Sequence, residues 1–208
     1  MDGMLTNLRS RLGAWLASKL REEHHVRGFV VVVDNSRPDI ETAAVLTRLD
    51  EALALLEQYA PRRLRHLERD LAQFLIVRYP CRGAYMPDTR TCLTELTFLA
   101  RRDISAAVVA SSILHEGIHA RVAQFRKRVG GYSRDEDRAR EERLCRRGEI
   151  AFGKALPAEL GAPVIERAEA SIAMDDADVA PAIDWTIAAA RIAAADVEGV
   201  GRARKLAE

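Results

Sequence analysis

Five consecutive residues in the middle of the chain carry the clearest chemical signal: His115, Glu116, Gly117, Ile118 and His119. On an α-helix, histidines four residues apart share one face, so one zinc ion can take a nitrogen from each. Glu116 lies off that face and can act as general base on a zinc-coordinated water. With five histidines in the chain, this arrangement has a chance frequency on the order of 1%. The segment therefore predicts one zinc ion per chain, bound by His115 and His119.

The flanking residues predict the helix that this metal site requires. Apolar or small side chains recur every three or four residues from Ile104 to Phe125, and His115 lies on that stripe. Asp103 or Ser105 is placed to begin the helix. Three basic residues near position 128, followed by a Gly-Gly pair, are typical of a helix end.

A second helix is predicted just after the Gly-Gly turn. Ser133 and Glu136 form a capping box, so this helix is expected from Arg134 until just before Pro157. Several side chains step by threes and fours along one side of it, namely Glu142, Cys145, Glu149, Phe152 and Leu156. That side is expected to face the HEGIH helix.

A catalytic zinc site needs a third protein ligand and leaves its fourth position to water. Glu142, on the inward stripe of the second helix, is the predicted third ligand. Glu141 is the alternative, because it also lies one turn before Cys145. No further histidine follows His119 at the spacing used by the metzincins.

These features resemble the gluzincin branch of the zincin metallopeptidases, in a compact minigluzincin-like form. The resemblance covers Thr91 to Leu156 and rests on HEGIH, the tight turn and a helix-borne glutamate some twenty residues later. It implies a zinc metallopeptidase that hydrolyses peptide or related amide bonds, with Glu116 as base and Glu142 (or Glu141) as third ligand. It also implies that the strand just before the HExxH helix, expected at Thr91–Phe98, lines the substrate cleft.

The chain departs from the thermolysin-like pattern in one respect. That pattern places an aspartate four residues after the liganding glutamate, whereas here Cys145 follows Glu141 and Arg146 follows Glu142 at that distance. The carboxylate that orients a ligand histidine must therefore come from elsewhere, and Glu149 is the candidate.

Hydrolysis through a tetrahedral intermediate also calls for a donor to the oxyanion. Tyr132, in the turn between the two site helices, is the predicted donor, with Tyr85 or His25 as alternatives. Two other functions remain open: a zincin-fold binding or regulatory module with little or no turnover, and a structural zinc protein in which Cys145 completes four ligands. The structural site would leave Glu116 without a role.

Bulk composition narrows the partners and the compartment. The 208 residues carry 32 basic and 31 acidic side chains, so a nucleic-acid partner is not expected. The resemblance to metallopeptidases implies a peptide or protein substrate as the partner. No apolar run is long enough to span a bilayer, so membrane association is not expected either. Three cysteines suit a reducing, cytoplasmic setting, although a Cys81–Cys92 bridge is the alternative. The oligomeric state is not predicted.

The predicted fold class is α+β, a mainly helical zincin-like domain with a small mixed β-sheet packed on the HExxH helix. The whole chain, 1–208, is expected to form one domain, with a catalytic core at 28–157 between an amphipathic N-terminal helix at 1–25 and an Ala-rich helical segment at 158–208. Within the core the expected elements are strands at 28–34, 74–77 and 91–98, the last at an edge, helices at 36–59 and 61–72, and a turn-rich connection at 79–90.

Overall fold

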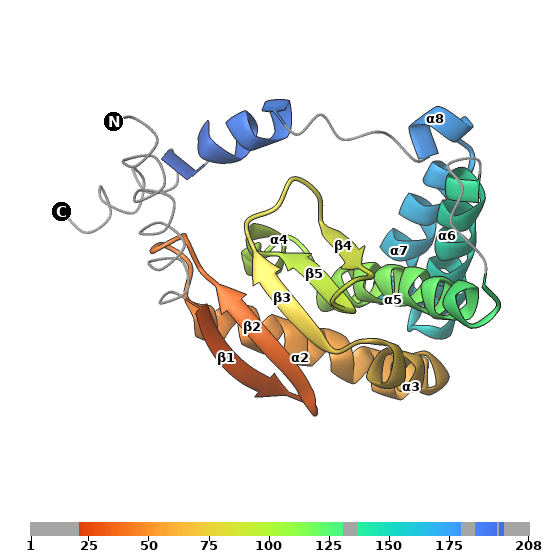
Figure 1. Cartoon of the computed structure of the whole chain (residues 1–208), viewed down its shortest axis with the longest axis horizontal. Coiled ribbons are helices and arrows are strands. Elements are labelled where there is room, and N and C mark those ends of the chain that lie inside the picture. Colours follow the sequence, from red (N-terminus) through yellow and green to blue (C-terminus); the bar gives the residue numbers. More distant parts are fainter. Residues whose placement is uncertain (1–20, 131–136, 180–185, 195, 198–208) are drawn as a thin grey trace.

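A mixed sheet of five strands organises the described part of the chain (Figure 1). The computed structural model describes residues 21–130, 137–179, 186–194 and 196–197. The strand order is β1-β2-β3-β5-β4, and the strands are β1 (Arg21–Val26), β2 (Phe29–Asp34), β3 (Gln73–Val77), β4 (Gly83–Met86) and β5 (Thr91–Glu95). The three central strands run parallel, and β1 and β4 pair antiparallel at the two edges.

The central strands follow from their apolar residues. Side chains on alternate positions of β2 and β3 point into the core, so Val31, Val33, Phe74 and Ile76 are almost completely buried. Phe29 adds an edge-to-face contact to the ring of Phe74, with centroids 5.2 Å apart. These β-branched and aromatic residues fit a pleated surface that is covered by helices.

Helices cover one face of this sheet and extend beyond its β4 edge. They are α2 (Thr42–Tyr59), α3 (Pro61–Asp70), α4 (Leu96–Ala100), α5 (Ala106–Arg128), α6 (Arg138–Ala155), α7 (Ala158–Ile172) and α8 (Asp176–Val179). In Figure 1, α2, α3 and α5 lie behind the sheet, and α6 and α7 stand beside α5. The predicted fold class, α+β with a small mixed sheet against the HEGIH helix, is confirmed.

Helix α5 is the central element of the core. It begins where predicted, with the Ser105 hydroxyl accepting a hydrogen bond from the main-chain N–H of Val108, and it ends at Arg128. Most of its residues from Ala107 to Ala120 are buried, because α2, α3 and α6 all pack on it. The stripe expected to run to Phe125 ends earlier, since Phe125 is 61% exposed.

The N-terminal prediction needs a correction at its end. Residues 21–25 were expected to finish a helix, but they belong to β1, and residues 1–20 lie outside the described part of the chain. Arg27 and Gly28 both have positive φ, 47° and 83°. This conformation makes a tight hairpin turn whose twist matches that of the flanking strands, so β1 folds back on β2.

The strand expected at 91–98 is also different. It ends at Glu95, whose carboxylate accepts a hydrogen bond of 2.7 Å from the main-chain N–H of Phe98 and so caps α4. It is an interior strand rather than an edge strand, because β4 pairs with its outer side. The segment 79–90, expected to be a turn-rich connection, therefore contains the true edge strand at Gly83–Met86.

Smaller differences concern element ends and termini. Helix α2 begins at Thr42 rather than near Pro38, and α7 spans Ala158–Ile172. The capping box predicted for α6 lies in residues 131–136, outside the described part, and the described helix begins at Arg138. The three cysteines are free thiols. Within the described residues, no helix is both long and apolar enough to cross a membrane.

Candidate metal centre

The two histidines of HEGIH meet on the face of α5 that is turned toward α6. Their rings are 4.9 Å apart between centroids, and the two Nε2 atoms are 3.1 Å apart. Gly117, between them in sequence, faces the other side of the helix, where a Cβ would lie 2.2 Å from the Leu67 side chain of α3. The motif thus places its ligands toward α6 and uses its glycine to let α3 approach.

A carboxylate holds the outer nitrogen of each imidazole ring: buried Glu149 at His115 and half-buried Glu141 at His119. Glu149 Oε1 lies 2.6 Å from His115 Nδ1, and Glu141 Oε1 lies 2.7 Å from His119 Nδ1. A carboxylate on Nδ1 fixes the orientation of a ring and leaves Nε2 free to bind a metal. The two Nε2 atoms are the nitrogens that lie next to each other, 3.1 Å apart. The contact between Glu149 and His115 is the one expected from the sequence, while the contact of Glu141 was not foreseen.

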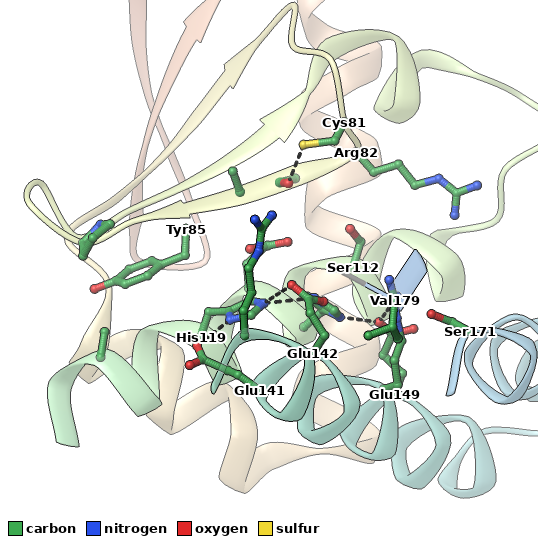
Figure 2. A pocket seen from close by; sticks show the side chains of 18 of the residues that line it. Cys81, Arg82, Tyr85, Ser112, His119, Glu141, Glu142, Glu149, Ser171 and Val179 are labelled. Carbon is green, nitrogen blue, oxygen red and sulfur yellow. Dashed lines mark hydrogen bonds and ion pairs between the residues drawn. The ribbon is translucent and has the colours of Figure 1, made fainter. Parts of the chain in front are cut away.

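Glu142 lies beside His119 in the cleft (Figure 2), and its carboxylate contacts the Nε2 atoms of both histidines. Its Oε2 is 3.1 Å from His115 Nε2, and its Oε1 is 3.3 Å from His119 Nε2. Zinc binds nitrogen and oxygen at about 2.0–2.1 Å in a tetrahedron, which sets the spacing between donors at about 3.3 Å. The separation of 3.1 Å between the two Nε2 atoms fits two positions of such a tetrahedron. Glu142 contacts the two rings through different oxygen atoms, and either oxygen could supply a third position.

The electrostatics of this cluster favour a positive charge at its centre. Burial lowers the pKa of His115, but hydrogen bonds to Glu142 and Glu149 outweigh it and raise the pKa overall. His119 behaves in the same way, its pKa raised by hydrogen bonds with Cys145, Glu141 and Glu142 against the effect of burial. In turn the two rings hold the pKa of Glu142 well below its usual range, although burial opposes this. Anionic groups thus surround the histidines on several sides.

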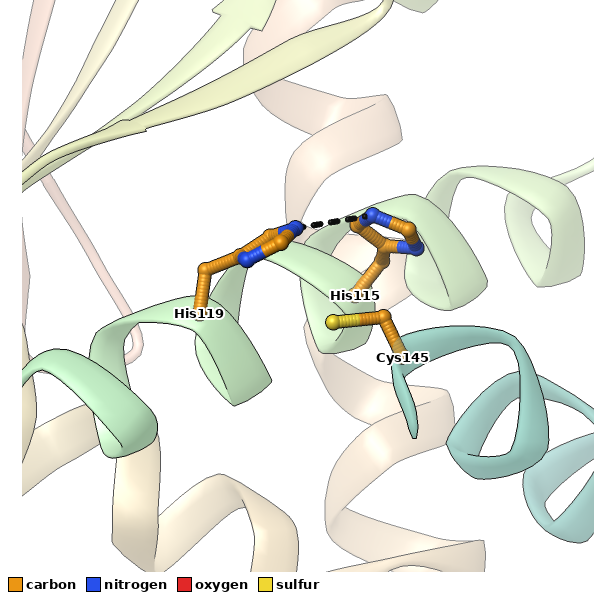
Figure 3. A group of neighbouring side chains, drawn as sticks. All are labelled: His115, His119 and Cys145. Atoms are coloured by element: carbon orange, nitrogen blue, oxygen red, sulfur yellow. Dashed lines mark hydrogen bonds between the residues drawn. The ribbon is translucent and has the colours of Figure 1, made fainter. Parts of the chain in front are cut away.

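Cys145 is a further donor close to the histidine pair (Figure 3). Donor atoms of His115, His119 and Cys145 all lie within 4.8 Å of one another, so this cluster could hold a metal ion. Burial raises the pKa of the Cys145 thiol to about 11. The thiol is fully buried, whereas Glu142 lines an open cleft. The two candidate third ligands therefore differ in whether they face solvent.

Glu116 lies beside the cluster, against the edge strand of the sheet. Its carboxylate accepts a hydrogen bond from the main-chain N–H of Tyr85, and burial raises its pKa. A Cβ on Gly83 of β4 would lie 3.2 Å from Glu116 Cγ. The absence of a side chain at Gly83 thus allows β4 to pass directly over the carboxylate.

An open cleft with a volume of about 1610 Å³ contains these groups. Strand β4 and the loop before it form one wall, and α5, α6 and α7 form the other (Figure 2). His115, Glu116, His119 and Glu142 all line it. The strand expected at 91–98 does not line the cleft; the neighbouring strand β4 takes that position.

The structure places the three candidates for the oxyanion donor differently. Tyr132 lies outside the described residues. Tyr85 lines the cleft, and its buried hydroxyl has no hydrogen-bond partner among the described residues. His25 is wrong as a candidate, because it lies on β1 at the opposite edge of the sheet from β4.

Sequence reasoning missed Arg126, which forms an ion pair with Glu141, and the pair of arginines that hold Glu149. Arg126 and Arg146 stand at helical spacing from residues of the site, but their sequence surroundings resemble ordinary solvated faces. Arg167 comes from another helix, α7, and only the packing of α7 on α6 brings it to Glu149. Comparisons with known proteins add no assignment: no family model, no curated protein and no solved structure matches the chain.

Proposed function

We propose that the chain is a zinc-dependent metallopeptidase of the gluzincin type, with His115, His119 and Glu142 as ligands and Glu116 as general base. One observation carries this proposal: the Glu142 carboxylate contacts both Nε2 atoms, which lie 3.1 Å apart, and all three residues line an open cleft. When bound there, zinc would supply Lewis-acid chemistry, lowering the pKa of a coordinated water and polarising a carbonyl group.

Glu116 performs the proton transfers in this proposal. It accepts a proton from the attacking water and passes it to the nitrogen of the leaving amine as the peptide bond breaks. Burial raises the pKa of Glu116 toward neutrality, which suits a group that must both accept and donate a proton. The hydrogen bond from the Tyr85 main-chain N–H holds its carboxylate in place.

Glu141 and Glu149 act as positioning residues rather than ligands. Each accepts the Nδ1 proton of one histidine, so each ring keeps the tautomer that leaves Nε2 free. Tyr85, whose hydroxyl is unpaired among the described residues, is the oxyanion donor in this proposal. Strand β4 offers the free sheet edge against which a zincin would align an extended substrate.

The second candidate function is a structural metal site formed by His115, His119 and Cys145, supported by the proximity of their donor atoms. It gives no role to Glu116 or to the cleft. Turnover separates the two functions, because only the peptidase hydrolyses peptides.

The test compares the zinc-loaded protein with Glu116→Gln, which keeps the shape of the side chain and removes the base. We expect both proteins to bind one zinc per chain, and only the first to cleave a mixed peptide library. Equal cleavage by both proteins refutes the role of Glu116. A protein that binds no zinc, and whose stability is unchanged by His115→Ala, refutes the metal site.

A further inference from the structure

Three arginines gather in one part of the cleft beside the proposed metal centre. Arg82 comes from the loop before β4, Arg146 from α6 and Arg167 from α7. All three line the same cleft as the HEGIH motif. In Figure 2, Arg82 extends along the upper wall of the cleft, across from Glu149.

Arg146 and Arg167 share a single carboxylate. Glu149, which is fully buried, lies 2.7 Å from Arg146 Nη1 and 3.1 Å from Arg167 Nη2, and it also holds His115. One negative charge thus serves two guanidinium groups and an imidazole ring. In addition, the Nε atoms of both arginines are buried and have no hydrogen-bond partner among the described residues. Each guanidinium group therefore has one buried donor that no described residue uses.

Arg82 lacks even a shared carboxylate. Its guanidinium lies 5.5 Å from the centroid of the Phe98 ring, and no described carboxylate is paired with it. Burial lowers the pKa of Arg82, and the nearby charges of Arg167 and Arg146 lower it further. The three cations are thus close enough to repel one another.

Three guanidinium groups that line one cleft form a site to which an anion can bind. Arg146 and Arg167 are half-buried and share one carboxylate, whereas Arg82 is exposed to the cleft. A carboxylate accepts two parallel hydrogen bonds from the fork of an arginine. Arg146 and Arg167 also position Glu149, which accounts for their presence. Arg82 has no described carboxylate partner, so its guanidinium can donate to a ligand in the cleft.

We propose that Arg82, Arg146 and Arg167 form a subsite for a carboxylate of the substrate, so that the enzyme prefers peptides carrying an acidic side chain or a free C-terminal carboxylate on that side of the cleaved bond. This inference rests on the proposed peptidase function and names its substrate class. The subsite adjoins the metal centre, because Glu149 contacts both the arginines and His115.

The experiment uses Arg82→Gln in the full-length, zinc-loaded protein, because Arg82 contacts none of the proposed ligands. Lys127→Gln is the matched control: it removes one positive charge from an exposed residue that also lines the cleft. The probes are peptide libraries with Glu or Gln fixed at the central position and an amidated C-terminus. The Gln library is also made with a free C-terminal acid, which separates the two sources of carboxylate.

We expect the native protein to cleave at least one carboxylate-bearing library faster than the neutral, amidated one. Arg82→Gln should lower kcat/KM for that library about 10–100-fold, the effect of losing a charge-assisted hydrogen bond, and should leave the neutral library unaffected. Lys127→Gln should change neither. Equal cleavage of all libraries by the native protein, or an equal loss on all of them in Arg82→Gln, overturns the subsite and leaves the peptidase intact.

A binding measurement separates this failure from failure of the proposed function. Peptide binding is followed by fluorescence anisotropy in Glu116→Gln and in the double variant that adds Arg82→Gln. If these variants bind carboxylate-bearing peptides selectively and need Arg82 to do so, while the native protein cleaves no library, the subsite is supported and the peptidase is overturned. Binding that does not distinguish carboxylate from amide overturns the subsite.

Discussion

The identity of the third ligand can be decided by two substitutions on one helix. Glu142 and Cys145 are three residues apart on α6, and each brings a donor atom to the histidine pair. Glu142→Ala removes the carboxylate that lies 3.1 and 3.3 Å from the two Nε2 atoms. Cys145→Ala removes a buried thiol and leaves the Glu142 carboxylate and both imidazole rings in place. The two variants therefore test the two assignments separately.

The expected magnitudes follow from the contacts of each side chain. Carboxylates that orient a ligand histidine from outside contribute about 10–100-fold to metal affinity, so loss of a direct ligand should exceed about 100-fold in Glu142→Ala. Cys145→Ala should leave zinc affinity unchanged. Its cost should appear as about 1 kcal/mol of lost stability, from the small cavity left by a fully buried sulfur atom.

The assay measures zinc affinity by competition with a chelator, with circular dichroism as the check that each variant is folded. Cobalt(II) substitution gives an independent readout, because thiolate ligation adds a charge-transfer absorption band that carboxylate ligation lacks. Loss of zinc binding in Cys145→Ala but not in Glu142→Ala, or a thiolate band in the cobalt protein, would refute the assignment of Glu142 and favour a structural His-His-Cys site.

Three further predictions concern the surroundings of the site. Glu149→Gln should weaken zinc binding about 10–100-fold in the same competition assay, because an amide orients the ring of a ligand histidine less firmly than a carboxylate. Gly161→Ala should lower the free energy of unfolding by about 1–3 kcal/mol, because its Cβ would lie 2.1 Å from a main-chain carbonyl oxygen of α6. Urea denaturation measures this change, and an unchanged denaturation midpoint would contradict the tight contact. Asp70→Asn should cost about 1 kcal/mol at neutral pH. Burial raises the pKa of Asp70, but the contact with Arg69 outweighs this effect and lowers the pKa below 3.8. The stabilisation is therefore present above pH 3.8 and is lost as the pH falls through the lowered pKa. Denaturation curves that differ equally at neutral and acidic pH would exclude this account.

Local signals were sufficient to predict the helix that carries the motif. Ser105 caps α5, basic residues fill its last turn, and HEGIH lies on the buried side, as expected. Three residues of the motif, His115, Glu116 and His119, line the same cleft. These features are local in sequence, so they are visible before any tertiary contact is known.

The edge strands could not be predicted in the same way. Strand β1 has polar, largely exposed side chains on both faces, so no alternation of apolar residues reveals it. Strand β4 has only four residues and lies in a segment rich in proline and glycine. Its strand geometry comes from pairing with β5 and from the close approach that Gly83 allows to Glu116. Both strands are set by their partners rather than by their own sequences.

The choice between Glu141 and Glu142 was beyond the sequence for a different reason. Both carboxylates do face the histidine pair, one at Nδ1 of His119 and the other between the two Nε2 atoms. Helical phase identifies the side of α6 that faces α5, but it does not distinguish the inner from the outer nitrogen of a ring. That distinction depends on the relative position of the two helices.

The position of α6 along α5 therefore determines the geometry of the candidate metal site. One helix supplies the carboxylate between the rings, Glu142, and the two carboxylates behind them, Glu141 and Glu149. The two helices approach closely at Gly148, where a Cβ would lie 2.3 Å from the Ile118 side chain of α5. A shift of α6 by one residue would move all three carboxylates away from their nitrogens at once. Gly148 thus sets both the apolar contact between the two helices and the geometry of the polar site. A larger residue at position 148 should therefore weaken metal binding, although it contacts none of the proposed ligands.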